Sequence, residues 1–246
     1  MNIVIPMAGR GQRFVDAGYA VPKPMIPVLG RPMYSWAVES LPLELASRLI
    51  FVCLAEHLEG HGLAEDIAAR YRRFGPVVRG LEAVTRGQVC TVLTARDLLD
   101  PSQPLLIYNA DTWCRTRLGE RLPALPAEVD GLLGVFEAPG DHWSFARTDA
   151  TGRVVETAEK RRISPWASTG LYHFSRTGDF LRHADAMIAA EDTTRGEFYV
   201  APLYNRMLRE GADLRLDVAE EVRVLGTPAE LAAFVGTPPS VAGGPR

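Results

Sequence analysis

The chain has 246 residues, with 27 lysines and arginines against 30 aspartates and glutamates. Its formal charge of −3 gives no electrostatic argument for nucleic acid or an anionic membrane as a partner. No stretch approaches the roughly 20 apolar residues of a membrane span, and the N-terminus lacks the basic flank of a signal peptide. The three scattered cysteines Cys53, Cys90 and Cys114 suit reduced thiols. We therefore expect a cytoplasmic globular protein.

Strands and helices alternate in the first half of the chain. Short β-branched runs predict buried strands, and longer runs with helical spacing of apolar residues predict helices. We expect strands at 2–7, 47–55, 75–81 and 104–111, the last ending in an acidic loop, and helices at 31–41, 56–74 and 87–99. Such alternation predicts crossover units and a mostly parallel sheet with covered faces.

The second half is richer in strands. We expect strands at 131–138, 144–160 with a turn at 150–152, and 167–174, then helices at 177–191 and 197–210, short strands at 213–218 and 222–225, and a helix at 228–235. The sequence therefore predicts one α/β domain over residues 1–236. The Pro/Gly-rich tail at 237–246 is predicted to be disordered.

A loop with two glycines and two arginines follows the first predicted strand. Loops at the carboxyl ends of parallel strands lie where ligands bind in open α/β sheets. Gly9 and Gly11 allow close backbone approach, and Arg10 and Arg13 can reach phosphate oxygens. A polyphosphate site and an ordinary tight turn with solvated arginines both fit. The third glycine of a dinucleotide fingerprint and the Gly-Lys-Ser/Thr of a P-loop are missing.

A lysine stands between two prolines a few residues later. Pro22 and Pro24 stiffen the backbone, so they present Lys23 from a rigid extended segment. A rigidly held lysine soon after a phosphate loop suits a phosphate clamp. A surface lysine in a proline-rich connection is the alternative.

Taken together, these motifs resemble the signature of nucleotidylyltransferases that act on sugar 1-phosphates, the sugar-nucleotide pyrophosphorylases. Further motifs of the resemblance follow in family order: TRGQVCTVLTA at 85–95, NAD at 109–111, EK at 159–160, ASTGLYHF at 167–174, EFYVAPLYN at 197–205 and LGTPAEL at 225–231. The resemblance implies a Rossmann-like nucleotide-diphospho-sugar transferase fold, with a twisted, mostly parallel mixed sheet and helices on both faces. It also implies a nucleotide-binding half, residues 1–115, and an acceptor-binding half, residues 116–236.

The implied reaction joins a nucleoside monophosphate, taken from a nucleoside triphosphate, to a sugar 1-phosphate and releases pyrophosphate. The attacking phosphate has a second pKa near ~6, so it is already largely dianionic and needs no general base. The difficulty is the repulsion between two polyanions. Cations aimed at the transition-state charge and in-line positioning overcome it.

The resemblance also implies roles for individual residues. Arg13, Lys23 and Lys160 are the expected catalytic residues, on the pyrophosphate, the α-phosphate and the incoming phosphate respectively. Gly87 and Gln88 are expected against the base. The full nucleotide set is Ala8, Gly9, Gly11, Arg13, Lys23, Gly87, Gln88, Asn109 and Asp111, and the acceptor set is Glu159, Lys160, Thr169, Gly170 and Glu197.

Three of these residues also have ordinary structural explanations. Asp111 is the expected Mg²⁺ ligand, because that ion prefers carboxylates, water and phosphate oxygens, but an aspartate after a strand also forms turns. Lys160 belongs to the charged run EKRR, and Glu197 suits the first turn of the helix predicted there.

One position departs from the family pattern. Many relatives carry a second metal-binding aspartate two residues before the glycine of the GTP motif, where this chain has Val224. Either Asp111 and phosphate oxygens hold the ion alone, or Asp217, Glu220 or Glu221 replaces the missing carboxylate.

Other functions remain open from the sequence. A cytidylyltransferase for a non-sugar phosphate or phosphonate, such as phosphocholine, uses the same chemistry. A non-catalytic nucleotide-binding regulator is kept open by Val224, whereas a glycosyltransferase would lack the pair Arg13 and Lys23. The expected partners are a nucleoside triphosphate and a phosphorylated small molecule, and a homodimer through the second half is compatible with the sequence.

Overall fold

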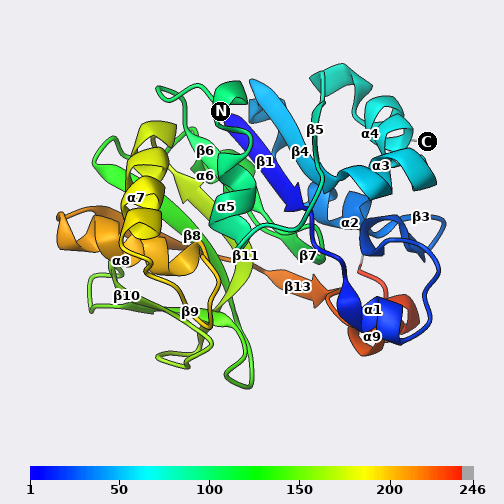
Figure 1. The fold of residues 1–246 in the computed structure, drawn as a ribbon. Coiled ribbons are helices and arrows are strands. Elements are labelled where there is room, and N and C mark those ends of the chain that lie inside the picture. The colour runs from blue at the N-terminus through cyan, green and yellow to red at the C-terminus, as the bar shows by residue number, and fades with distance from the viewer. Residues whose placement is uncertain (240–246) are drawn as a thin grey trace.

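The computed structural model describes residues 1–239, so the predicted disorder at 237–246 falls largely outside the described residues. Parallel pairing joins the strands of the first half in the order β6-β1-β4-β5 (Figure 1). Parallel strands bring their carboxyl ends to one edge of a sheet. These strands are β1 (Asn2–Met7), β4 (Arg48–Leu54), β5 (Val77–Leu81) and β6 (Leu105–Tyr108).

The second half extends the same sheet with mainly antiparallel pairs. β11 pairs antiparallel with β6, β8 and β9, β10 pairs antiparallel with β9, and β12 runs parallel to β8. The result is a nine-stranded mixed sheet, which confirms the predicted α/β class. The added strands are β8 (Val129–Glu137), β9 (Ser144–Thr148), β10 (Val154–Glu159), β11 (Trp166–Phe174) and β12 (Asp213–Val218).

Helices cover both faces of the sheet, as predicted. Side chains of β1 alternate between the two faces: Val4 belongs to one buried cluster, and Ile3 and Ile5 belong to another. The first cluster includes side chains of α5, α7 and α8, and the second includes side chains of α2 and α4 (Figure 1). The helices are α2 (Met33–Glu39), α3 (Ala55–His61), α4 (Leu63–Arg70), α5 (Gln88–Leu93), α7 (Thr177–Ala189) and α8 (Ala201–Arg209).

A two-stranded sheet carries the end of the chain back to its beginning. β13 pairs antiparallel with β7, and the orange β13 leads to the red helix α9 beside the blue helix α1 in Figure 1. A third apolar cluster, which includes Phe14, Trp36 and Phe234, joins these segments. The remaining elements are α1 (Gln12–Asp16), β2 (Pro27–Val28), β3 (Arg31–Pro32), β7 (Thr112–Arg115), α6 (Leu118–Arg121), β13 (Glu221–Val224) and α9 (Pro228–Gly236), with short 3₁₀ turns at 23–25, 43–45, 72–74 and 96–98.

The helix predicted at 197–210 begins later than expected. α8 starts at Ala201, with Pro202 in its first turn, where proline is favoured. Glu197 instead closes a tight turn with Thr194, whose N–H donates to the Glu197 carbonyl over 3.0 Å. The interpretation of Glu197 as a residue of the first helical turn is therefore wrong.

The structure bears on two expectations from the composition, which concern the cysteines and membrane-spanning segments. All three cysteines are free thiols, and Cys53 and Cys114 are buried. Across residues 1–239, no helix combines the length and the apolar character needed to cross a bilayer.

Helix α9 is held by its cap and by one apolar face. The Thr227 hydroxyl accepts a hydrogen bond from the Glu230 N–H over 3.2 Å, and Pro228 occupies the first helical position. Leu231 and Phe234 are buried, and the Phe234 ring meets Trp36 edge-on with centroids 4.9 Å apart. The helix is therefore fastened to the N-terminal part of the chain.

We expect Phe234→Ala to lower the free energy of unfolding by about 3–5 kcal/mol, because it empties a packed aromatic site. Val235→Ala is the matched control on the same helix, since Val235 is 46% exposed, and it should change stability by about 0.5 kcal/mol or less. Urea denaturation measures both values. Equal effects of the two substitutions would contradict this account of α9.

Candidate active site

A cavity of about 940 Å³ opens where the first-half strands end. Residues of both halves line it, from the loop after β1, the turn after β6, the end of β10 and the loop before α8. The predicted nucleotide and acceptor residues all lie on its wall: Ala8, Gly9, Gly11, Arg13, Lys23, Gly87, Gln88, Asn109, Asp111, Glu159, Lys160, Thr169, Gly170 and Glu197. The structure thus brings this whole set together, and their individual roles stay predictions.

The two glycines of the first loop serve different purposes. Gly11 has φ +64°, and a Cβ there would lie 2.7 Å from the Lys23 Cβ, so only glycine lets the loop meet the Pro-Lys-Pro segment. A Cβ on Gly9 would meet no atom of residues 1–239 within 4 Å. Protein packing therefore explains Gly11 and leaves the space beside Gly9 free for a ligand.

An ion pair joins the two loops that follow β1 and β6. The Lys23 ammonium contacts the Asp111 carboxylate, with the two side chains 19% and 28% exposed. The Asp111 carbonyl accepts a hydrogen bond from the Leu225 N–H over 2.7 Å, which ties the end of β13 to the same turn. A partly buried pair is screened less than a surface pair, so it holds both charges at the cavity.

A hydrogen-bonded pair of amides lies beside this ion pair. Gln88, the first residue of α5, donates through Nε2 to the Asn109 Oδ1 over 2.7 Å. Gly170 has φ +82°, and a Cβ there would lie 2.2 Å from the Asn109 Nδ2. Gly170 therefore makes room for Asn109, and Asn109 orients the Gln88 amide.

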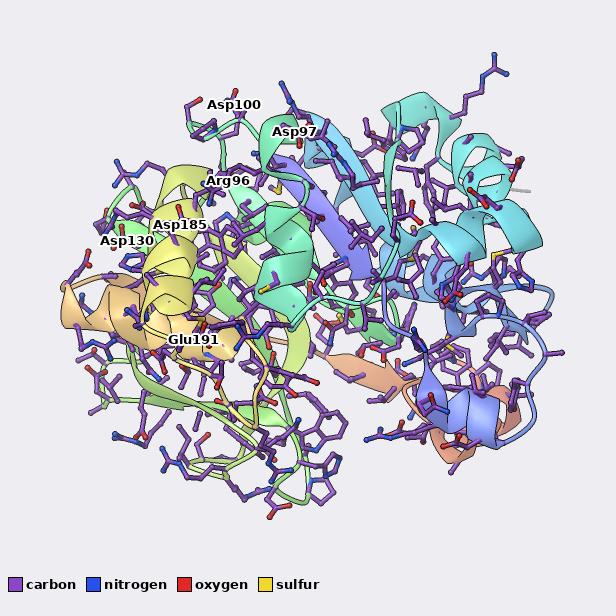
Figure 2. The ribbon with its side chains drawn as sticks, viewed as in Figure 1. Arg96, Asp97, Asp100, Asp130, Asp185 and Glu191 are labelled. Carbon is purple, nitrogen blue, oxygen red and sulfur yellow. The ribbon has the colours of Figure 1, made fainter. Side chains whose placement is uncertain are left out.

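The loop before α5 is fastened to the loop before α8 around one aromatic residue. Phe198 donates its N–H to the Arg86 carbonyl over 2.8 Å and accepts from the Val89 N–H over 3.1 Å. Gly87 has φ +121°, and a Cβ there would lie 2.6 Å from the Phe198 N, so the position has no room for a side chain. The Arg86 guanidinium also pairs over 2.6 Å with Glu191, labelled in Figure 2 after α7. These contacts couple the two halves at the cavity.

The second-half wall carries a lysine, a tyrosine and a buried carboxyl. Lys160 has φ +52° at the end of β10, and its ammonium hydrogen-bonds to the Tyr199 hydroxyl. The Glu159 carboxylate accepts from the Ser144 hydroxyl. Burial raises the pKa of Glu159, against the hydrogen bond from Ser144 and the charge of Lys160, and Glu197 raises it further.

Some residues on the cavity wall were not predicted from the sequence. Arg195 lines the cavity with a left-handed φ of +52°, and Tyr199 lies on the same wall. Arg195 and Gly196 directly precede Glu197, and this Arg-Gly pair could have indicated that Arg195 lies on the cavity wall. No local pattern marks Tyr199, because its position depends on how β10 and the loop before α8 pack.

The predicted replacements for a second metal ligand are wrong. Asp217 is buried and pairs with Arg121, while Glu220 and Glu221 pair with Arg115 over 3.2 and 3.0 Å. None of the three carboxylates lines the cavity. In the described part of the chain, no group of three or more His, Cys, Asp or Glu side chains is arranged to hold a metal ion. One or two protein carboxylates with water and substrate phosphates nevertheless suffice to bind a hard cation such as Mg²⁺.

Comparison with known proteins agrees with this geometry. The sequence profile of a family described as "Nucleotidyl transferase" matches residues 3–210. The bifunctional protein GlmU of Burkholderia ambifaria is 29% identical over 225 residues, which cover 87% of this chain and 46% of that protein. GlmU of Burkholderia orbicola is 33% identical over 170 residues, covering 67% of this chain and 34% of the relative. The chain therefore spans half or less of the length of these curated relatives.

A crystal structure from Vibrio cholerae RC9, described as a nucleoside-diphosphate-sugar pyrophosphorylase, is similar over its whole length. Its TM-score is 0.81 at 33% identity, and the match covers 96% of this chain and 100% of that chain. The likeness extends across both walls of the cavity.

We expect Gly170→Ala to weaken nucleotide binding by about tenfold or more, because the new methyl group displaces Asn109 and breaks its hydrogen bond with Gln88. Gly152→Ala is the control: Gly152 has φ +80°, and a Cβ there would meet no atom within 4 Å in the part of the chain that the structure describes. Fluorescence titration with nucleoside triphosphates and thermal unfolding separate the two effects. Both variants should lose stability from backbone strain, and equal nucleotide affinity in both would contradict the role of Gly170.

The raised pKa of Glu159 predicts a gain of stability on its removal. A carboxyl whose pKa is higher in the folded state costs stability as pH rises above its ordinary value of 4.5. Glu159→Gln should therefore raise Tm by a few degrees near about pH 7 and much less near about pH 4.

Glu156→Gln on the same strand should show the opposite sign. Hydrogen bonds from Arg161 and Arg147 lower the pKa of Glu156, so its charged form stabilises the fold above the ordinary carboxyl pKa. Differential scanning fluorimetry at the two pH values tests both variants. A fall in Tm for Glu159→Gln near neutral pH would contradict the predicted burial cost.

Proposed function

The chain belongs to the nucleotidyl transferase family, and we propose that it transfers a nucleoside monophosphate from a nucleoside triphosphate to a sugar 1-phosphate, with release of pyrophosphate. One observation carries the proposal. Basic side chains from opposite walls, Arg13 and Lys23 on one and Lys160 on the other, line the same cavity. That arrangement suits a reaction in which two phosphate groups must meet.

The first wall supplies the binding of the triphosphate. The open space beside Gly9 lets phosphates approach the backbone. Arg13 neutralises the β- and γ-phosphates that leave as pyrophosphate, and Lys23 acts on the α-phosphate. The Gln88 amide, oriented by Asn109, pairs with the edge of the base.

The second wall supplies the acceptor. Lys160 and Arg195 hold the incoming phosphate, and Glu159 and Glu197 accept hydrogen bonds from sugar hydroxyls. A phosphate oxygen of the acceptor forms a bond to the α-phosphorus, while the bond from that phosphorus to the bridging oxygen breaks and pyrophosphate leaves. No side chain has to remove a proton, since the phosphate monoester is already largely dianionic.

A divalent cation completes the charge balance. Enzymes of this family are generally dependent on a divalent metal, and we propose Mg²⁺ with Asp111 as its protein ligand. A bound Mg²⁺ would stabilise the negative charge that builds up on the phosphate oxygens. Lys23 now pairs with Asp111, so its ammonium must move from the carboxylate to the α-phosphate when substrate binds.

We also propose how the domain is divided between the two substrates and in which cellular compartment the protein acts. Residues 1–115 provide the nucleotide half and residues 116–236 the acceptor half of one domain. The three free thiols support a reducing compartment such as the cytoplasm.

We expect pyrophosphate release with Mg²⁺, one nucleoside triphosphate and one sugar 1-phosphate. The test covers ATP, CTP, GTP, UTP and dTTP against hexose and heptose 1-phosphates, cyclitol phosphates, phosphocholine and simple phosphonates. Asp111→Ala should lower kcat/KM by about 10³-fold, because it removes a charge used at the reacting phosphates. Asp97→Ala should leave activity unchanged, since the Asp97 side chain, labelled in Figure 2, is exposed and pairs with Arg79.

The acceptor panel separates the other functions. Release with phosphocholine or a phosphonate alone would replace the sugar 1-phosphate by a non-sugar acceptor. Nucleotide binding without release for any acceptor would contradict the proposed transfer and favour a nucleotide-binding regulator.

A further inference from the structure

We infer that Glu230, on helix α9, supplies the second carboxylate of the metal site beside Asp111. This inference rests on the proposed function, because it concerns the divalent cation of that reaction. It resolves the departure at Val224, where the resemblance implies an aspartate. The three acidic residues considered before that position in the chain, Asp217, Glu220 and Glu221, are all held elsewhere by arginines.

The Glu230 and Asp111 carboxylates both approach Gly226. The position that a Cβ on Gly226 would occupy lies 3.2 Å from the Glu230 Oε2 and 3.5 Å from the Asp111 Oδ2. The Val224 Cγ1 lies 3.7 Å from the same point. Glu230, Gly226, Val224 and Asp111 all line the cavity. The missing side chain at Gly226 thus leaves a space bordered by two carboxylate oxygens.

The donor chemistry of this space fits Mg²⁺. Mg²⁺ is bound in phosphoryl-transfer sites by one or two carboxylates together with water and substrate phosphates. Two carboxylate oxygens without imidazole or thiolate suit Mg²⁺ or Mn²⁺ better than Zn²⁺. The residues present therefore fit the cation that the family uses.

The Glu230 carboxylate has no other partner among residues 1–239. Its sequence position, three residues after the cap Thr227, is that of a capping box, in which the glutamate would bond back to the Thr227 N–H. Only half of that box is formed: Thr227 Oγ1 accepts from the Glu230 N–H, but the Glu230 side chain makes no hydrogen bond or ion pair within the described chain. The side chain borders the cavity instead.

The surrounding structure holds Glu230 at a set position relative to Asp111. The Leu225 N–H donates to the Asp111 carbonyl over 2.7 Å, directly before Gly226. One turn into α9, Leu231 and Phe234 are buried against the N-terminal segments. The two carboxylates are therefore brought together by backbone hydrogen bonding and apolar packing, although their own charges repel.

Binding of Mn²⁺ alone tests the inference without relying on activity. The signal of free Mn²⁺ in electron paramagnetic resonance gives its affinity for the full chain. We expect Glu230→Gln to weaken binding by about tenfold or more, and Asp111→Ala to weaken it at least as much. Glu221→Gln, a matched change on a carboxylate paired with Arg115, should bind Mn²⁺ like the unmodified chain.

Two further variants distinguish metal binding from helix capping. Thr227→Ala should lower Tm through the lost cap and leave Mn²⁺ affinity unchanged. Glu230→Gln combined with Val224→Asp should recover Mn²⁺ binding, because the new carboxylate borders the same space beside Gly226. Recovery would support the site even if Glu230→Gln itself lowers stability.

The outcomes separate this inference from the proposed function. Unchanged Mn²⁺ affinity in Glu230→Gln, with a loss in Asp111→Ala, would overturn the role of Glu230 and leave the proposed function standing. Unchanged affinity in both variants would overturn the metal site of the proposed function as well. A loss in Glu230→Gln that Thr227→Ala reproduces fully would assign Glu230 to capping and overturn the inference.

Discussion

The parallel pairing of β1 with β6 is the constraint on which the rest of the site depends. Its register places Asn2 beside Leu105 and Val4 beside Ile107, so both strands run toward the same edge of the sheet. The loop that follows β1 and the turn that follows β6 therefore enter one cavity. The ion pair of Lys23 with Asp111 can form only because these two connections meet there.

Charge in this protein is arranged locally. A formal charge of −3 over the whole chain offers no general attraction for a polyanion, so the cations must be concentrated where phosphates bind. Each of the two lysines on the cavity wall already has a partner: Lys23 pairs with Asp111, and Lys160 bonds to the Tyr199 hydroxyl. These contacts hold the cations in place, and the proposed reaction requires that contacts with substrate replace them.

The two ends of the described chain build the site together. β13 pairs with β7, and α9 packs on the segments around Phe14 and Trp36. This return brings Gly226 beside Asp111, while the contacts around Phe198 join the loop before α5 to the loop before α8. Contacts between residues that are far apart in sequence thus build the cavity wall. A methyl group added at Gly87 or Gly170 would displace residues from other segments of that wall.

The sequence by itself determined most of the elements, because strands, helices and turns have local signatures, and its resemblance to a known family implied most of the cavity wall. Apolar runs marked β1 and β4, glycines marked the tight loop, and the resemblance implied Asp111, whose place after a strand fits that role. Only the tertiary structure decided which acidic side chain stands beside Asp111. Asp217 and Glu221 looked suitable in sequence, yet arginines hold them away from the cavity, whereas nothing in the sequence singled out Glu230. Its approach to the cavity depends on the packing of α9 against the N-terminal segments, and no local pattern contains that information.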